Sequence, residues 1–509
     1  MNNTHHYTLS QFLIRTYYIF LAALLLLFFF SIAISSSVSS LLFFGGEAVL
    51  FWLYKKYLSV KIDSFPDSSF ILLCCFVLLI GCAAMVLLPV SMNSYFPSDT
   101  QIIYDAAAYL SKHRDLSGIY DSFGGYATLG FERFSDYFCR YYNNILMLLT
   151  VTAIYKVFGW TGFKIGTASG QVLAIAVTSI FMVIGIIYFL KAITLLTKSK
   201  SNILLGILLT FSFLALYYSC PNVYTDIWVI PFMLIACFHW VAYCKQGTSL
   251  NLVVCAILLG IGALYKITAL IQVVTIVIYS LLNNNWGLKR KIIVILAFVF
   301  IILLIFSLFK LWYRSSPIFD FSRERDLYYP WTLWLCFGSH ANGMYNRQDC
   351  ELAYSTPYEQ RDAIVWNEIK KNYSSYSFKS YISFIANKWS LTWSDGLFDG
   401  GYYTQYPISD EWSWTLRLTQ PSFRTYWLLH YFSNGYILFL FFLLLCKTLI
   451  HIKNKDKSIS IFFLLSLLIL GFIIYLSFFE SAPRRAIPAI FAAIGAAVLS
   501  SSTTSKINC

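Results

Sequence analysis

The chain has 509 residues, of which 58% are hydrophobic and only 12% are charged, and its formal net charge is +13. A soluble domain carries about 25% charged residues, so this composition excludes a large soluble protein, and several apolar runs exceed the roughly 18 residues of a spanning helix. The positive charge lies mainly in short loops between apolar runs, which is typical of membrane topology and argues against nucleic-acid binding.

The apolar runs predict an all-α polytopic membrane protein with twelve spanning helices. No small-residue cleavage site follows the first run, so we expect a retained helix rather than a removed signal peptide. The predicted spans cover residues 12–33, 38–54, 69–91, 168–192, 202–219, 227–243, 250–265, 267–283, 291–312, 425–446, 459–478 and 486–501.

Basic residues follow every second predicted helix, which places these loops and both termini in the cytoplasm. The run 143–160, NNILMLLTVTAIYKVFGW, would invert every later loop if it crossed the membrane, and it is short for a span. We therefore predict an interfacial helix on the outer surface, with Lys156 and Trp160 at the level of the headgroups.

The predicted topology divides the chain into five regions. Residues 92–167 and 313–424 are expected to be extracytoplasmic, and the second of them, rich in Trp and Tyr, to form a compact folded region on the membrane face. The other three regions hold helices 1–3 (1–91), helices 4–9 (168–312), and helices 10–12 with a cytoplasmic tail (425–509).

Most acidic residues lie in the two predicted outer regions. Twelve of the 24 lie in 313–424 and six in 92–167, and most of these are expected to be solvated charges. Asp99 and Asp105, in the stretch FPSDTQIIYDAAAYL, follow a predicted span directly. Two interpretations of these aspartates are open: they are solvated loop residues, or they lie at the edge of a functional site.

Three acidic residues lie within predicted spans or at span ends, where a charge is costly and a partner is expected. Asp226, in YYSCPNVYTDIWVIPF, is predicted to cap the helix that follows, to belong to a site, or to do both. Glu480 lies in the outer turn FFESAPRRAIP. Glu47 lies inside the second helix and is predicted to form a hydrogen bond to a neighbouring helix.

Basic residues occur in the same predicted outer turns. Lys266, in GALYKITAL, either extends to the membrane surface or contacts a phosphate as a point charge. Arg484 and Arg485 lie on an extracytoplasmic turn against the positive-inside tendency, which favours an anion-binding role. Arg140, which precedes the interfacial helix, is predicted to have the same role.

Carboxylates and cations that converge on one membrane face suit a substrate with a phosphate leaving group and an acceptor hydroxyl. A carboxylate can serve as the general base for the hydroxyl, and a basic residue can stabilise the departing phosphate oxygen. The sequence contains no P-loop and no GxGxxG motif after a strand, so a lipid-phosphate-linked sugar is a more natural donor than a nucleotide sugar.

The cysteines predict no metal site. Half of the twelve lie inside apolar runs, where a thiol is a small hydrophobe. No CxxC motif occurs, and no Cys/His spacing suits zinc. Cys336 and Cys350 share one polar loop, which leaves a disulfide between them open.

These segments together resemble the GT-C superfamily of membrane glycosyltransferases, the polyprenyl-phosphate-sugar-dependent class related to protein mannosyltransferases and the lipid A aminoarabinose transferase. The likeness is a succession of short matches over most of residues 90–490. The first outer loop of the family resembles FPSDTQIIYDAAAYL, and its interfacial helix resembles RYYNNILMLLTVTAIYKVFG. The second outer loop resembles CPNVYTD. The family's helix–Lys–helix turn resembles LGIGALYKITALI, and its late Glu/Arg turn resembles ESAPRRAIPAI. YISFIANKWSLTWSDGLFDGGYY and FGSHANGMYNRQD resemble outer segments of a bacterial branch tied to cell-envelope glycans.

The resemblance implies catalytic roles for two aspartates. Asp99 matches the family's aspartate better than Asp105 and would act as the base, with Asp226 assisting it. Thr100 stands where protein mannosyltransferases have a glutamate, which argues against a protein acceptor. The residues expected to hold the donor phosphate are Lys266, Arg140, Arg484 and Arg485, with Glu480 in a supporting role.

The implied function is transfer of a sugar from a polyprenyl-phosphate-linked donor to an envelope glycan, either O-antigen or a cell-wall polysaccharide side branch. The expected location is the extracytoplasmic face of a bacterial inner membrane. The family has members with and without a divalent metal, so a metal stays open and no other cofactor is expected. Two alternatives remain: an O-antigen polymerase or ligase, and a lipid-linked glycan flippase, which would need broken helices and polar residues at mid-membrane.

Overall fold

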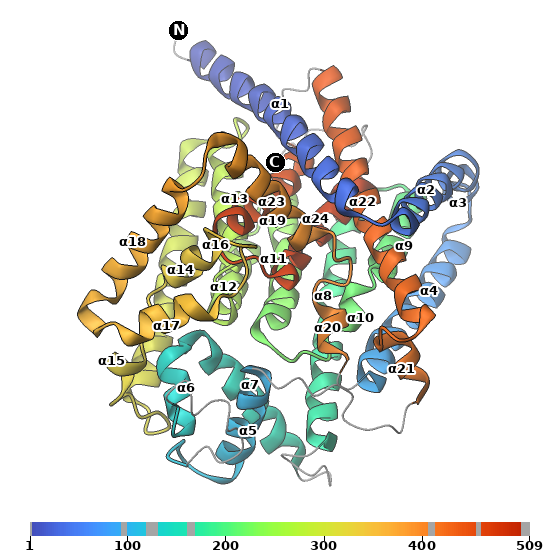
Figure 1. Cartoon of the computed structure of the whole chain (residues 1–509). Coiled ribbons are helices and arrows are strands. Elements are labelled where there is room, and N and C mark those ends of the chain that lie inside the picture. The colour runs from blue at the N-terminus through green and yellow to red at the C-terminus, as the bar shows by residue number, and fades with distance from the viewer. Residues whose placement is uncertain are drawn as a thin grey trace.

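The computed structural model describes residues 3–92, 99–118, 131–159, 168–405, 413–454 and 460–499. Within these residues the regular elements are all helices, from α1 (Asn3–Ser35) to α24 (Ile487–Val498), and they pack against one another around an extended apolar core (Figure 1). The all-α polytopic fold that the apolar runs predict is therefore confirmed.

Each of the twelve predicted spans coincides with one helix or a pair of consecutive helices in the described residues. In the part of the chain that the structure describes, eight stretches are long and apolar enough to cross a membrane. They are formed by α1, α2 (Val38–Leu53) with its continuation η1 (Tyr54–Leu58) and α3 (Ser59–Asp63), α4 (Asp67–Ser91), α8 (Ala168–Leu196), α11 (Thr225–Gln246), α14 (Leu288–Ser315), α22 (Arg424–Lys453) and α23 (Ile461–Phe478). The other predicted spans are the shorter helices α9 (Lys200–Ser212) with α10 (Ala215–Ser219), α12 (Ser249–Tyr265), α13 (Ala269–Leu282) and α24.

The predicted span 202–219 is broken between α9 and α10. Phe213 leaves the helical conformation with ψ of 87°, which frees carbonyl groups at the end of α9. The hydroxyl of Tyr217 donates to the carbonyl of Phe211 at 3.0 Å, and that of Tyr436 donates to the carbonyl of Leu209 at 2.6 Å. An apolar environment requires such substitute partners for freed backbone groups, so the break is built into the fold.

Three helices of the first large segment lie together at the bottom of Figure 1: α5 (Asp99–Lys112), α6 (Phe134–Arg140) and α7 (Ile145–Phe158). The predicted interfacial helix is α7, which follows the short turn η3 (Tyr142–Asn144) and packs along α5, with further contacts to α8 and α12. Its place at a membrane surface stays a prediction, and Trp160 lies outside the described residues.

The second large segment is a set of short helices with a hydrophobic cluster of its own. That cluster includes Leu333, Phe337, Ala353, Val365 and Ile369. The helices are α15 (Glu324–Leu327), α16 (Leu333–Gly338), α17 (Arg347–Ser355), η5 (Tyr358–Gln360), α18 (Arg361–Ser374), α19 (Phe378–Trp393), α20 (Gly400–Tyr403) and α21 (Ser413–Thr419). The segment is thus folded, and α19 joins it to α23 and to the turn η7 (Pro483–Ala486).

One buried lysine fastens this segment to the end of α23. Lys388 of α19 is fully buried, and its Nζ donates to the carbonyls of Gly338, Ser477 and Phe479 at 2.8, 3.0 and 2.7 Å. A Cβ on Gly338 would lie 2.0 Å from the carbonyl oxygen of Phe478, so only glycine allows this close approach. The turn after α23, which carries Glu480, is therefore held by the second large segment.

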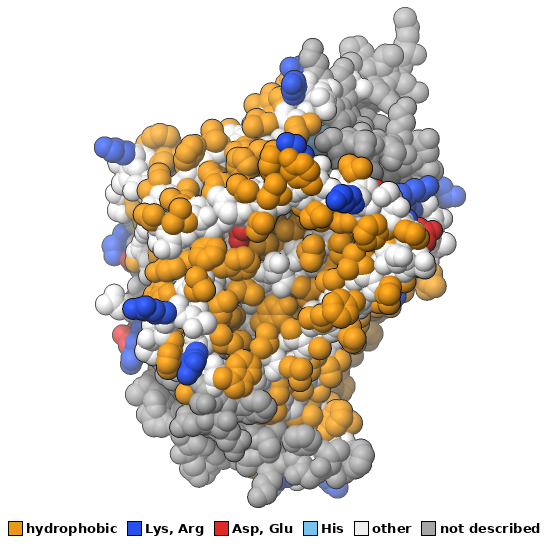
Figure 2. Space-filling view, turned by 90° about the vertical axis from the view of Figure 1, so that its right-hand side faces the viewer, with side chains coloured by type: hydrophobic (Ala, Val, Ile, Leu, Met, Phe, Trp, Pro, Cys, Tyr) orange, Lys and Arg blue, Asp and Glu red, His pale blue; other side chains and the backbone are white. Residues whose placement is uncertain are grey.

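The exterior shows where lipid would contact the chain. Figure 2 views the face at the right of Figure 1, where α2, α3 and α4 lie, and hydrophobic side chains cover most of its centre. Leu42, Leu72 and Leu79 on these helices are 72%, 72% and 70% exposed. Glu47 of α2 turns inward instead, but its carboxylate oxygens have no hydrogen-bond partner among the described residues. The predicted bond from Glu47 to a neighbouring helix is therefore not seen.

Candidate functional site

A cavity of about 1740 Å³ opens between the spanning helices and the second large segment. Its apolar wall comes from α13, α14 and α23, through side chains such as Ile271, Phe306 and Leu470. Its charged wall consists of Asp99, Lys266, Lys310, Asp399, Glu480, Arg484 and Arg485. Sites for drug-sized ligands measure about 300–1,000 Å³, so this cavity has room for a larger ligand with an apolar part and a charged part.

Asp99, the first residue of α5, lies partly exposed on the cavity wall. The hydroxyl of Tyr224 donates to its Oδ2 at 3.1 Å, and no ion pair joins Asp99 to a cation within the described residues. Burial raises the pKa of the Asp99 carboxyl above its ordinary value, although the hydroxyls of Tyr224 and Tyr137 oppose this. Asp105 lies six residues further along α5, where it accepts a bond of 2.6 Å from Gln101.

Asp226 has a different environment. Its side chain is 1% exposed, and its carboxylate oxygens lie 3.1 Å from Nζ of Lys266, 3.0 Å from Nε of Arg484 and 3.8 Å from Nε of Arg485. The capping role that the sequence allowed for Asp226 is not seen, because Tyr224 is the N-cap of α11 and no side chain caps this helix. Asp226 instead holds three cations in fixed positions.

Two further carboxylates balance these cations. Nη1 of Arg484 lies 3.2 Å from Oδ2 of Asp399, and Nη2 of Arg485 lies 2.7 Å from Oε2 of Glu480. Asp226, Asp399, Glu480, Lys266, Arg484 and Arg485 thus form one charge network, with Asp226 at its centre. The ion pair with Asp226 directs Lys266 into the protein rather than toward the membrane surface.

Arg140 lies apart from the charge network. Its guanidinium is 4.4 Å from the ring centroids of both Phe131 and Tyr329, and its Nε donates to the carbonyl of Leu327 at 3.0 Å. Tyr329 lines the cavity and Arg140 does not, so Arg140 lies behind the wall. The structure therefore brings together all the predicted site residues except Arg140, which joins α6 to the second large segment.

Asp399 was not predicted from the sequence. It lies in SDGLFDGGYY, and both Phe398 and Asp399 have left-handed backbone conformations, with φ of 51° and 64°. Such a conformation costs a non-glycine residue about 1–3 kcal/mol and is concentrated at functional sites. Burial raises the pKa of Asp399 to about 6, against the opposing charge of Arg484. The pair of glycines that follows Asp399 is the one sequence signal that could have marked it among the acidic residues of its segment.

Tyr224 connects the two aspartates, and it too was not predicted. It is the N-cap of α11, two residues before Asp226, and its hydroxyl reaches Asp99 across the cavity wall. Nδ2 of Asn144 donates to the same hydroxyl at 3.3 Å, and Nζ of Lys266 lies 5.7 Å from the centroid of the ring. The tyrosine thereby sets the separation between Asp99 and the charge network.

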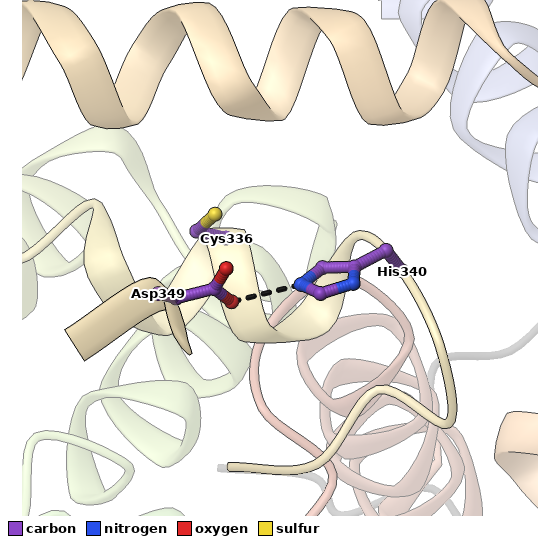
Figure 3. Close-up of side chains that lie close together, drawn as sticks. All are labelled: Cys336, His340 and Asp349. Atoms are coloured by element: carbon purple, nitrogen blue, oxygen red, sulfur yellow. Dashed lines mark hydrogen bonds and ion pairs between the residues drawn. The ribbon is translucent and has the colours of Figure 1, made fainter. Parts of the chain in front are cut away.

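A set of side chains with the geometry of metal ligands lies beside the charge network rather than in it. Cys336, His340 and Asp349 have ligand atoms within 4.8 Å of one another, and within the described residues no other such set occurs (Figure 3). The expectation that no Cys/His spacing suits zinc overlooked this set, because its third member is a carboxylate on a different helix. Cys336 and Cys350 are both free thiols in this structure, so the disulfide that the sequence left open is not formed.

Comparisons with known proteins give the chain a family. Residues 98–490 match the family model described as a conserved hypothetical integral membrane protein. A solved structure described as ArnT from Cupriavidus metallidurans bound to undecaprenyl phosphate is similar at 12% identity and a TM-score of 0.35, over 84% of this chain and 78% of that chain. No curated protein matches the sequence. The family model covers more than half of the chain, which therefore belongs to this family of conserved hypothetical integral membrane proteins.

Proposed function

We propose that the chain is a GT-C-type glycosyltransferase that moves a sugar from a polyprenyl-phosphate-linked donor to a cell-envelope glycan on the extracytoplasmic face of a bacterial inner membrane. The observation that carries this proposal is one cavity that joins an apolar wall, a set of cations and Asp99, a carboxylate that forms no ion pair among the described residues. The apolar wall suits a polyprenyl chain, the cations suit a phosphate, and Asp99 suits an acceptor hydroxyl that must lose a proton.

The donor would occupy both walls of the cavity. The polyprenyl chain would lie against α13, α14 and α23, and its phosphate would meet Lys266 and Arg484, which line the charged wall in front of Asp226. Arg484 uses Nε for Asp226 and Nη1 for Asp399, and its Nη2 has no protein partner among the described residues. That group is available for a phosphate oxygen, which arginine binds with directional hydrogen bonds.

The acceptor would meet Asp99. Asp99 would take the proton of the acceptor hydroxyl while the oxygen of that hydroxyl forms a bond to the anomeric carbon of the sugar. The bond from that carbon to the phosphate oxygen would break, and its electron pair would leave with the lipid phosphate. The raised pKa of Asp99 supports the role of a general base, whereas Asp226 would keep the phosphate-binding cations in position.

Binding of the lipid tests the donor part of the proposal. Purified full-length protein should be stabilised against heat by undecaprenyl phosphate and not by undecaprenol, which lacks the phosphate. Arg484→Lys, which keeps the charge but loses the planar donor set, should weaken this binding about ten-fold. Arg347→Lys is the matched control, because Arg347 is exposed and pairs with Glu351 outside the cavity. Equal stabilisation by both lipids would contradict a phosphate site.

Transfer itself is tested in cells. A deletion strain should lose one sugar substituent from an envelope glycan and regain it with the wild-type gene. Shortened glycan chains with every substituent present would favour a polymerase or ligase. Flux of a lipid-linked sugar across vesicles without a transfer product would favour a flippase.

A further inference from the structure

Cys336, His340 and Asp349 converge from three parts of the second large segment. Cys336 lies on α16, His340 on the loop that follows α16, and Asp349 in the first turn of α17. Figure 3 shows the imidazole of His340 pointing at the carboxylate of Asp349, with Cys336 beside them. Nε2 of His340 lies 2.8 Å from Oδ2 of Asp349. All three ligand atoms lie within 4.8 Å of one another.

We propose that these three side chains bind a divalent transition-metal ion of the zinc type. A set of one sulfur, one nitrogen and one oxygen ligand is typical of Zn²⁺ and the neighbouring late transition metals, and unsuited to Mg²⁺ or Ca²⁺, which prefer oxygen. Ligand atoms around tetrahedral zinc lie roughly 3.5 Å apart. Metal binding therefore requires the His340–Asp349 contact of 2.8 Å to open, while the thiol starts within 4.8 Å of both partners.

The surroundings supply what such a centre requires. Cys336 is 1% exposed and Asp349 is 6% exposed, so the site excludes most water, and the His340 side chain retains 25% exposure as an entry path. Glu368 of α18 interacts electrostatically with both Cys336 and His340, and Lys371, whose Nζ lies 3.0 Å from Oε1 of Glu368, offsets part of its negative charge. Three protein ligands leave a fourth position for water or for this carboxylate.

A metal at this position would stabilise the loop between Cys336 and Asp349. The loop between Cys336 and Asp349 contains Gly343, whose carbonyl accepts a bond of 2.6 Å from the backbone N–H of Ser481. The same loop contributes Asn342, Met344 and Tyr345 to the cavity wall. A metal that joins α16 to α17 would therefore close this loop at its base and hold the wall beside Glu480.

Metal content tests the proposal directly. Full-length protein in detergent, stripped with a chelator, loaded with Zn²⁺ and desalted, should retain one equivalent of metal. Co²⁺ in place of Zn²⁺ should give a thiolate-to-metal charge-transfer band. His340→Gln and Asp349→Asn should each lower zinc affinity at least roughly ten-fold, since even changes outside the ligand set cause losses of that size, and Cys336→Ser should abolish the cobalt band.

Matched variants separate ligands from neighbours. Cys350→Ser removes a thiol next to Asp349, and Glu351→Gln removes a carboxylate two residues from Asp349, and both variants should retain the metal and the band. The proposal is overturned if the wild-type protein retains no metal, if the control variants lose it equally, or if mass spectrometry finds Cys336 and Cys350 bridged in folded protein. Because the readout is metal, a failure here leaves the glycosyltransferase proposal unaffected.

Discussion

Asp99 and Asp226 lie on opposite sides of Tyr224, and their surroundings differ in kind. Asp99 faces the cavity, accepts a hydroxyl hydrogen bond and forms no ion pair within the described part of the chain. Asp226 is buried behind the cavity wall and contacts three cations. A carboxylate without an ion pair can exchange a proton with a substrate, whereas a carboxylate among cations keeps its charge and positions them. From this contrast we infer that Asp99 acts as the general base and that Asp226 holds the phosphate-binding cations in position.

The largest effect that would test this contrast is on catalysis at Asp99. Asp99→Asn should lower the transfer rate by about 10²–10⁴-fold, the usual contribution of a general base. The free energy of unfolding should stay unchanged or rise slightly, because the variant removes a largely desolvated charge that forms no ion pair within the described residues. Transfer assays and thermal unfolding of the same purified variant check both statements. Full activity in well-folded D99N protein would reverse the assignment.

The opposite pattern is expected at Asp226. Asp226→Asn removes the carboxylate that pairs with Lys266 and leaves Arg484 with Asp399 alone, so one buried positive charge is uncompensated and the free energy of unfolding should fall by about 3–5 kcal/mol. Activity should fall together with the amount of folded protein. Asp105→Asn serves as the control, because its carboxylate lies outside the charge network and should change stability little. A stable D226N variant would contradict the scaffold role.

The pH dependence of stability reports on Asp399. Its folded-state pKa of about 6 lies above the ordinary value of 3.8. The folded state therefore binds more protons than the unfolded state between these values, so its contribution to stability should fall as pH rises from about 4 to about 6, by up to about 3 kcal/mol. Asp399→Asn should remove this part of the dependence in unfolding experiments at several pH values, whereas Glu351→Gln should retain it. A steeper dependence in D399N protein would contradict the raised pKa.

The smallest effect is expected at Arg140. Arg140→Lys keeps the charge but loses stacking on Phe131 and Tyr329, so the free energy of unfolding should fall by about 1 kcal/mol. Affinity for undecaprenyl phosphate should be unchanged, in contrast to Arg484→Lys. A matching loss of affinity in both variants would place Arg140 at the phosphate after all.

Much of the candidate site was predictable because its residues are anomalous for their place in a membrane protein. Four charged residues lie in turns between apolar runs, where burying a charge costs free energy and a binding partner is therefore expected: Lys266, Glu480, Arg484 and Arg485. Asp399 and Arg140 show the limit of that reasoning. Both lie in polar segments where charges are common, so nothing local distinguishes a residue that joins the network from one that packs behind it.

The amino-acid sequence is sufficient to predict an all-α polytopic membrane protein and the positions of its helices, because helix formation in an apolar run depends on composition along a short stretch. Which charged side chains contact one another is seen only in the folded chain. Arg484 contacts Asp226 and Asp399, which are 258 and 85 residues away in the chain. Pairing over such separations follows from how helices pack, and packing depends on side-chain shapes over the whole molecule rather than on any local pattern.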